Sequence, residues 1–338
     1  MRGFFTVIAA LLAASAHAEV NQAQLAFFGQ LPAAMESATN PLTEPKIDLG
    51  RMLYYDTRLS KNHDVSCNSC HGLDTFGQDN LPGSPGHQGQ TGDRSSPSSY
   101  NAAGHIAQFW DGRAADVEEQ AKGPVLNPIE MAMPSEAAVV AVLKSIPGYV
   151  DAFAAAFPGE ADPVTYNNMA LAIGAFERKL VTPGRFDAYL AGDQAALTAA
   201  EKAGLEAYLA TGCQTCHMGP YVGGSMYQKL GLVKAWPDTS DLGRFSVSGN
   251  EFEKLFFKVP SLRNIAETGP YFHNGSVATL EEAVGLMAEY QLGRELDDAT
   301  VASIVTFLKA LTGEIPEAYV AKPELPASGA NTPAPDPS

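Results

Sequence analysis

The chain has 338 residues, of which 45% are hydrophobic and 18% are charged, and its formal net charge is −16. Such an acidic surface makes nucleic acid and anionic membranes poor partners, and we expect neither. It would attract a basic protein, although the same charge also serves the solubility of an exported protein. The length suits two domains, each large enough to bury its own core.

Residues 1–18 are predicted to be a signal peptide. Arg2 supplies the positive start, Phe4 to Ala14 the apolar core, and Ala16-His17-Ala18 a small-x-small cleavage site. The apolar run is too short to span a bilayer, and no later stretch reaches the required length. We therefore expect a periplasmic protein that begins at Glu19 and has no membrane span. An uncleaved anchor is the alternative.

Helices joined by long loops are predicted throughout, because period-two alternation is nearly absent. Short helical pieces over 19–65 lead into the first cysteine motif. The next stretch, 72–112, is rich in Gly, Pro, Ser and Asn and predicts a long ordered loop, which in a compact domain is usually functional. Helical periodicity then returns in four segments, 114–122, 135–146, 148–157 and 164–180.

The break at Thr182-Pro-Gly184 is predicted to divide two domains. After it, Thr198 and Glu201 form a capping box for a helix that ends at Gly212, directly before the second cysteine motif. A glycine-rich loop is predicted over 218–250. Two further helices follow, and we expect their N-caps to be Thr279, with Glu282 three residues later, and Asp298.

All four cysteines fall in two copies of Cys-x-x-Cys-His. Each pair of thiols can add to the vinyl groups of one haem, and the adjacent imidazole can then bind the iron axially. A redox couple, a disulfide or a zinc site could use the cysteines, but none of these explains a histidine at both motifs. We predict two covalently bound c-type haems, with attachment residues and proximal ligands Cys67, Cys70, His71, Cys213, Cys216 and His217.

The repeated motif predicts an all-α fold of two tandem cytochrome c-like domains, each with one covalently bound c-type haem and long ordered loops. We expect an N-terminal haem domain at 19–181 and a C-terminal haem domain at 182–314. The proline-rich tail, 315–338, is expected to be extended, with a disordered tip.

The ligand on the far side of each iron is open from the residues alone. Met287 lies on a predicted helix well separated from His217, but Leu280 and Val284 share its face, so a core role is as compatible as ligation. His/Met coordination would raise the reduction potential of that haem. His87 lies in a Gly/Pro-rich loop and could bind the first iron or simply be solvated.

The assembled motifs closely resemble those of the bacterial di-haem cytochrome c peroxidases, over about residues 46–315. Ordered motifs along one chain are far more specific than Cys-x-x-Cys-His alone. The motifs that carry the resemblance are Leu49–Asp56, Gln108–Arg113, Asn127–Met131, Phe257–Asn264, Gly269–Gly275 and Gln291–Gly293.

The resemblance implies that the N-terminal haem reduces hydrogen peroxide and the C-terminal haem passes electrons to it from a small c-type cytochrome or blue-copper protein. It makes Glu130 the catalytic acid–base, assisted by Gln120, and places Trp110 between the haems. It also implies that His87 caps the first iron in the resting oxidised state and that Met287 is the distal ligand of the second. The family further implies a homodimer.

A calcium ion between the domains is also implied, bound partly by backbone oxygens of Thr268 and Pro270. Ser95 stands where the family usually has the asparagine ligand of this ion, which puts its part in the site in question.

Two alternatives remain. The related haem enzymes that oxidise tryptophans of a partner protein carry Tyr in place of the axial Met and lack the capping His, so Met287 and His87 favour the peroxidase. Tyr290 lies one helical turn from Met287, however. The other alternative is a di-haem cytochrome that only transfers electrons, with both irons permanently six-coordinate.

Overall fold

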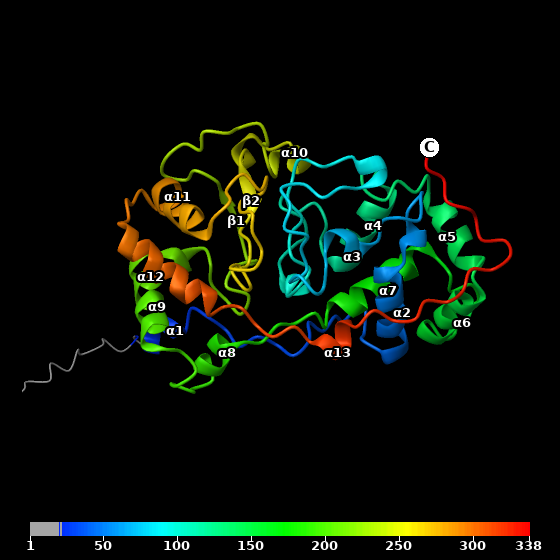
Figure 1. Cartoon of the computed structure of the whole chain (residues 1–338), viewed down its shortest axis with the longest axis horizontal. Coiled ribbons are helices and arrows are strands. Elements are labelled where there is room, and N and C mark those ends of the chain that lie inside the picture. The colour runs from blue at the N-terminus through cyan, green and yellow to red at the C-terminus, as the bar shows by residue number, and fades with distance from the viewer. Residues whose placement is uncertain (1–19, 21) are drawn as a thin grey trace, which may run out of the picture.

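A computed structural model describes residue 20 and residues 22–338, so the predicted signal peptide lies outside the described residues. The described chain forms two groups of helices that lie side by side (Figure 1). The first group contains α2 (Glu44–Tyr55), α3 (Cys67–Cys70), α4 (Val117–Leu126), α5 (Glu136–Lys144), α6 (Pro147–Ala156) and α7 (Tyr166–Glu177). The second contains α1 (Gln22–Leu25), α8 (Arg185–Leu190), α9 (Ala199–Thr211), α10 (Phe245–Ser248), α11 (Leu280–Leu292) and α12 (Asp298–Lys309).

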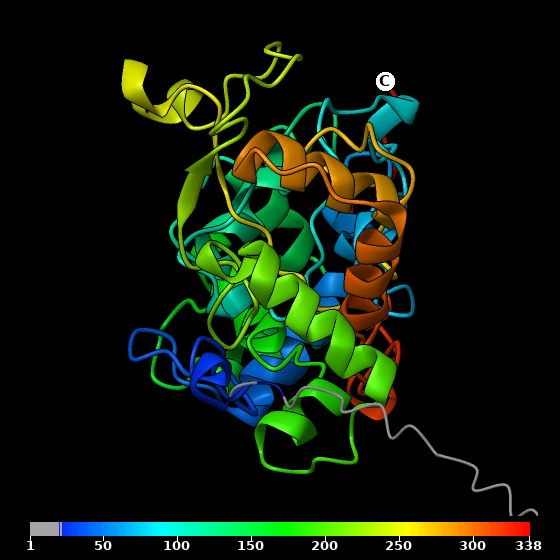
Figure 2. The same ribbon diagram turned by 90° about the vertical axis from the view of Figure 1, so that its left-hand side faces the viewer.

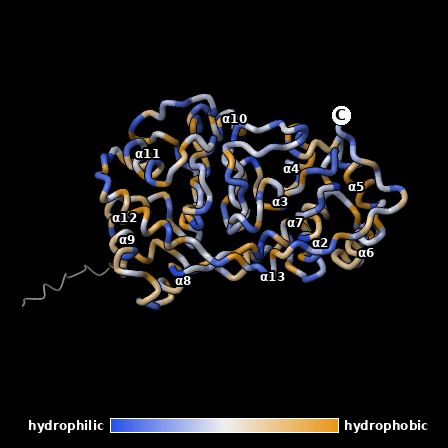
Figure 3. The backbone as a smooth tube through the Cα atoms, in the orientation of Figure 1, coloured by the Kyte–Doolittle hydropathy of each residue, from blue (hydrophilic) through white to orange (hydrophobic). Residues whose placement is uncertain are grey.

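Each group buries a hydrophobic core of its own, and the tube in Figure 3 shows hydrophobic segments in both. Between the helices run long ordered loops, as predicted. Short 3-10 turns interrupt these loops at η1 (Thr57–Leu59), η2 (His87–Gly89), η3 (Ala102–Gly104), η4 (Cys213–Thr215) and η5 (Glu251–Glu253).

A close crossing of α2 and α7 organises the first core. Gly50 permits it, because a Cβ at this position would lie 1.9 Å from the backbone oxygen of Ala172. One turn after this glycine, the fully buried ring of Tyr54 meets Phe176 edge-on, with the ring centroids 5.4 Å apart. Any larger residue at Gly50 would force the two helices apart.

The second core repeats this arrangement with α9 and α12. A Cβ at Gly204 would lie 2.2 Å from the backbone oxygen of Ser303. Tyr208, again one turn later, is buried with its ring centroid 5.2 Å from that of Phe307. The two groups therefore share a unit in which a glycine contact positions a tyrosine against a phenylalanine of the crossing helix.

Two of the three predicted N-caps are confirmed. The Thr198 hydroxyl accepts the Glu201 backbone N–H, and Glu201 accepts that of Thr198, as a capping box requires. The Thr279 hydroxyl likewise accepts the Glu282 backbone N–H and caps α11. The third prediction is wrong by one position: Asp297, not Asp298, accepts the Thr300 backbone N–H, at 2.8 Å. Asp298 is already the first helical residue.

A small antiparallel sheet was not predicted. It pairs β1 (Tyr227–Lys229), inside the predicted loop 218–250, with β2 (Phe256–Lys258). Strands of three residues are too short to show alternation in the sequence. The sheet faces the first group of helices in Figure 1, where the backbone N–H of Lys258 donates to the Trp110 carbonyl at 2.7 Å.

Both ends of the described chain pack on the group that is remote in sequence. Val20, Leu25 and Phe28 belong to the second core, although they lie within the range predicted for the first domain. The tail forms α13 (Glu317–Val320) and runs along the first group (Figures 1 and 2). The extended tail is therefore wrong for Glu317–Val320, which are helical and where Tyr319 stacks on Phe176 with centroids 5.1 Å apart, whereas residues 321–338 form no helix or strand.

The predicted domain break at Thr182 is a tightly bonded junction. The Thr182 hydroxyl accepts amide N–H groups from Asn101 and Asn264, both at 2.9 Å. Asn101 belongs to the first long loop and Asn264 to a loop of the second group. Thr182 is therefore fixed from both sides and is itself fully buried, whereas Pro183 beside it is exposed.

Within the described residues, no single helix is long and apolar enough to cross a membrane. Helices α5 and α6, bent by 104° at their junction, satisfy those criteria only as a pair.

Glu177, in the last turn of α7, is buried with 7% of its surface exposed. Burial raises the pKa of this carboxyl to about 8, nearby Glu118 adds to the rise, and Arg178 opposes it. In the unfolded chain the carboxyl titrates near 4.5. Between these values the folded protein holds a proton that the unfolded chain has lost, so stability falls as pH rises through this window.

We predict that Glu177→Gln removes this penalty. The free energy of unfolding of the variant should match that of the parent near pH 4.5 and exceed it at pH 8, by up to about 1.4 kcal/mol for each pH unit crossed. Urea unfolding at the two pH values measures the difference. Glu281→Gln, at an exposed carboxyl, is the control and should show no such trend. A gain that is independent of pH would contradict the prediction.

Candidate functional site

The first Cys-x-x-Cys-His motif forms α3, and its histidine is held by two backbone contacts. His71 Nδ1 lies 3.3 Å from the Gly77 carbonyl oxygen, and the Tyr54 hydroxyl donates to the His71 carbonyl at 2.9 Å. Burial lowers the pKa of the imidazole. A neutral ring with Nδ1 bonded to a carbonyl leaves Nε2 as the metal-binding nitrogen.

The second motif, at the end of α9 and in η4, has the same supports. His217 Nδ1 lies 3.1 Å from the Pro260 carbonyl oxygen, and the Tyr208 hydroxyl donates to the His217 carbonyl at 2.9 Å. Burial lowers the pKa of His217 to about 4. Both histidines are thus neutral and oriented before any ligand binds.

The four cysteines are free thiols. Burial raises the pKa of Cys70 to about 11 and that of Cys213 to about 12, so these thiols are protonated at neutral pH. Among the residues that the structure describes, no group of three or more His, Cys, Asp or Glu side chains could hold a metal ion. Unpaired thiols beside an oriented histidine fit covalent haem attachment at both motifs.

A large, mainly apolar cavity lies against the second motif. Cys213, Cys216 and His217 line one part of it, and Met287 on α11 contributes to the same lining. Tyr290 is absent from this lining; its ring packs on Trp236 with centroids 4.9 Å apart. The structure therefore brings Met287 to the second site and places Tyr290 outside it.

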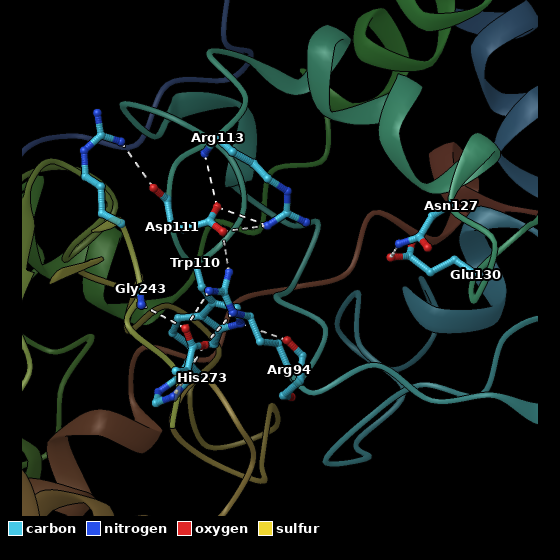
Figure 4. Close-up of polar contacts among 11 residues, drawn as sticks. Arg94, Trp110, Asp111, Arg113, Asn127, Glu130, Gly243 and His273 are labelled. Atoms are coloured by element: carbon cyan, nitrogen blue, oxygen red, sulfur yellow. Dashed lines mark hydrogen bonds and ion pairs between the residues drawn. The ribbon is translucent and has the colours of Figure 1, made fainter. Parts of the chain in front are cut away.

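Trp110 also lines this cavity and lies where the two groups of helices meet. Its indole N–H donates to the Ser95 carbonyl at 2.8 Å, while the backbone carbonyl of Trp110 accepts the backbone N–H of Lys258 in β2. Figure 4 shows Arg94 beside it. The Arg94 guanidinium binds Asp111 at 2.6 Å and Asp241 of the second group at 2.7 Å, which ties both groups to the tryptophan.

Glu130 lies apart from that cluster (Figure 4) and lines a second cavity with Phe109 and Arg113. The Asn127 amide donates to its carboxyl at 2.6 Å. Burial raises the pKa of Glu130, opposed by the Asn127 hydrogen bond and by Arg113. Its charge also acts on Cys70, which places it near the first motif.

Gln120 is on α4, but it is not among the residues that line the Glu130 cavity. Glu119 and Gly123 of the same helix do line it. The structure therefore puts Gln120 near this site without directing its side chain into the cavity.

His87 starts η2, and its loop is bonded to the Glu130 loop through a backbone hydrogen bond of 2.7 Å from His87 N–H to the Glu130 carbonyl. Its ring, 5% exposed, has Nε2 3.2 Å from the Ser338 carbonyl oxygen. The Gln88 amide donates to Pro337 at 2.9 Å, and Lys61 pairs with Asp336 at 3.6 Å. The expected disordered tip is therefore wrong: these contacts hold the tail against the His87 loop.

The residues of the implied calcium site lie near the meeting of the two groups. Thr268, Pro270 and Ser95 all line the cavity that contains Trp110. Ser95 Oγ already receives the Gln78 amide at 3.0 Å, and Asn80 directs its amide nitrogen, a donor, at the Glu267 and Gly269 carbonyls. These contacts do not form the all-oxygen shell that calcium requires, so the ion stays a prediction from the resemblance.

Two features of the site were missed by the sequence reasoning. One is the Arg94–Asp111–Asp241 network, whose members are far apart in the chain. The other is Lys258, a buried lysine that lines the same cavity as His217, together with His105. Its signal was present, because it interrupts the otherwise apolar segment Phe256 to Pro260.

Comparison with known proteins supports one family. The model of the di-haem cytochrome c peroxidase family matches residues 44–195. The chain is 47% identical over 317 residues to cytochrome c551 peroxidase of Pseudomonas aeruginosa, covering 92% of this chain and 90% of that protein. It is 46% identical over 298 residues to cytochrome c551 peroxidase of Nitrosomonas europaea, covering 88% of each.

A crystal structure of a MauG-like protein associated with microbial copper homeostasis has the same fold. Its TM-score is 0.77 at 30% identity, over 87% of this chain and 97% of that one. Fold and sequence together define a di-haem c-type protein. The chain belongs to the di-haem cytochrome c peroxidase family and is a peroxidase enzyme.

We predict that Met287→Ala lowers the reduction potential of the second haem, because a thioether ligand favours the reduced iron. Potentiometric titration followed by absorbance measures this, and the spin state reports the lost ligand. Tyr290→Phe is the matched control on the same helix and should leave both readings unchanged. The reverse pattern would make Tyr290 the ligand.

Proposed function

We propose that this protein reduces hydrogen peroxide to water at its first haem, with electrons that arrive singly through its second haem. The observation that carries this proposal is the unlike surroundings of two similar motifs. The cavity at His217 contains a thioether and mainly apolar side chains, whereas Glu130 is a half-buried carboxyl whose pKa is raised by desolvation and whose charge acts on Cys70 of the first motif. One site is suited to storing an electron and the other to moving a proton.

The haem bound at His71 would supply the iron that binds peroxide and part of the reducing power. The protein must then move a proton from the inner peroxide oxygen to the outer one, so that water can leave. Glu130 performs both halves of this transfer, as base and then as acid. Asn127 orients the Glu130 carboxyl by a hydrogen bond. Desolvation raises the pKa of this carboxyl, which helps it to hold the proton that it takes from peroxide.

Peroxide takes two electrons, whereas the expected donors supply one at a time. Two haems resolve this mismatch, one at each motif of two tandem cytochrome c-like domains, 19–181 and 182–314. The repeated glycine–tyrosine unit behind each motif supports this division. Trp110 would lie between them: its hydrogen bonds to both groups support a role as the residue through which an electron passes.

We infer the electron donor, the oligomeric state and the location from the family and from the net negative charge of the chain. We propose a small c-type cytochrome or blue-copper protein as donor, a homodimer and a periplasmic location. Gln120 would assist Glu130 once peroxide is bound, and calcium would bind near Thr268 and Pro270. A peroxide assay with a reduced small cytochrome c tests the central activity.

Oxidation of a partner protein's side chains is the second candidate, favoured by the 30% identity to a MauG-like protein. It requires tyrosine as the distal ligand of the second haem and a stable two-electron-oxidised state without added donor. Met287 lining the second cavity is an argument against it. A protein that only transfers electrons would leave Glu130 without a task and would show no turnover of peroxide.

We predict that Glu130→Gln abolishes peroxide turnover, with a loss of about 10²-fold or more, because the amide cannot exchange the proton. Stopped-flow or steady-state assays measure turnover, and haem absorbance must show both haems attached. Glu119→Gln is the control, since this exposed carboxyl lines the same cavity. Normal turnover in the Glu130 variant would remove the residue from the mechanism.

A separate prediction concerns His87. Reduction of the second haem alone should release His87 from the first iron and give a five-coordinate or high-spin signal there. His87→Gly should give that signal already in the oxidised protein, whereas His63→Gly, at another loop histidine, should not. A first haem that stays six-coordinate after half-reduction, in a fully active protein, would contradict the gating role.

A further inference from the structure

Lys258 is a buried cation without a counter-ion. It is the last residue of β2, and 6% of its surface is exposed. The hydrogen bond recorded for its ammonium group is to His105 Nδ1, at 3.1 Å, and no acidic side chain among the described residues forms an ion pair with it. A buried charge is costly unless it is paired, so the Lys258 ammonium group favours binding an anion.

His105 is equally incomplete. Its Nε2 is buried and has no hydrogen-bond partner within the described part of the protein. The ring is fixed from behind by Gly224, where a Cβ would lie 2.3 Å from it. Burial lowers the pKa of His105, and the charge of Lys258 lowers it further, so the ring is neutral. Lys258 and His105 thus offer donors that the protein itself leaves unused.

Both residues line the cavity that contains His217 and Met287. Two other basic side chains of this lining, Arg263 and His273, already have acidic neighbours. Arg263 binds both oxygens of Asp187, at 2.6 and 2.9 Å, and His273 lies 3.8 Å from Asp241. Of the charged groups described around the cavity, Lys258 is the one that lacks an acidic partner.

We propose that Lys258 and His105 form the binding site for one propionate of the haem attached at Cys213 and Cys216. A c-type haem carries its own carboxylates into a pocket, and a desolvated ammonium group is a suitable partner for one of them. This inference rests on haem attachment at the second motif. It does not depend on the peroxide reaction, so the two can fail separately.

The positive charge has a consequence for electron storage. An ammonium group beside the haem opposes the gain of positive charge on oxidation, so it stabilises the reduced form. Lys258 is therefore a positioning residue that holds the second haem at a higher potential than its other ligands would give. A neutral side chain in its place leaves the propionate unpaired and favours the oxidised haem.

The test is potentiometric titration of each haem in the intact two-haem protein, without peroxide. Lys258→Met should lower the potential of the second haem by at least a tenfold change in its reduction equilibrium, which is 59 mV for one electron. The first haem should not move. Lys258→Arg should retain most of the parent potential. Lys229→Met, at an exposed lysine of β1, controls for the change in net charge and should have no effect.

An unchanged second potential in Lys258→Met, with both haems attached, would overturn the proposal and leave Lys258 as a support for His105 only. A shift of the first haem instead, or an equal shift in Lys229→Met, would overturn it too. If Lys258→Met does not accumulate with both haems, Lys258→Gln keeps a polar end and carries the same expectation.

Discussion

The contact of Gly50 with the Ala172 backbone, and its repeat at Gly204, is the constraint on which both sites depend. Each glycine lets two helices touch and fixes a tyrosine one turn later. That tyrosine carries a hydroxyl to the carbonyl of the motif histidine, at 2.9 Å in both cases. The direction of the imidazole is therefore set by a helix crossing, so a methyl group at the glycine would disturb a histidine that it does not touch.

Different charges surround the same scaffold at its two motifs. At the second motif, the ammonium group of Lys258 lines a mainly apolar cavity and has no acidic partner among the described residues. Near the first motif lies the half-buried Glu130 carboxyl, whose loop is bonded to the loop of His87. A cation beside a haem favours the reduced form, while a carboxyl with a raised pKa can hold a proton closer to neutral pH. The division of roles that we propose for the two sites rests on these side chains rather than on the fold.

Much of the fold and of the candidate site could be predicted from the sequence, because the patterns that indicate them are local. The two Cys-x-x-Cys-His motifs, the caps at Thr198 and Thr279 and the long loop over 72–112 all depend on neighbours within a few residues. The features that escaped depend on distant partners. Arg94 and Asp241 meet only after folding, Tyr319 contacts Phe176 across 143 residues of chain, and β1 is too short to show a period. Lys258 is instructive, because its position was visible in a motif but its lack of a counter-ion was not.

Each end of the described chain packs in the core that is remote in sequence, which limits when each core can form during synthesis. The first core starts near Ile47, yet it lacks Tyr319 and Val320 until the last part of the chain has emerged. The second core, by contrast, includes Val20 and Phe28, which are made first and must wait for α9 and α12. Each core is therefore completed by a segment from the other end of the chain. Exchange of one half for a homologous half would require that segment to be matched to its new core.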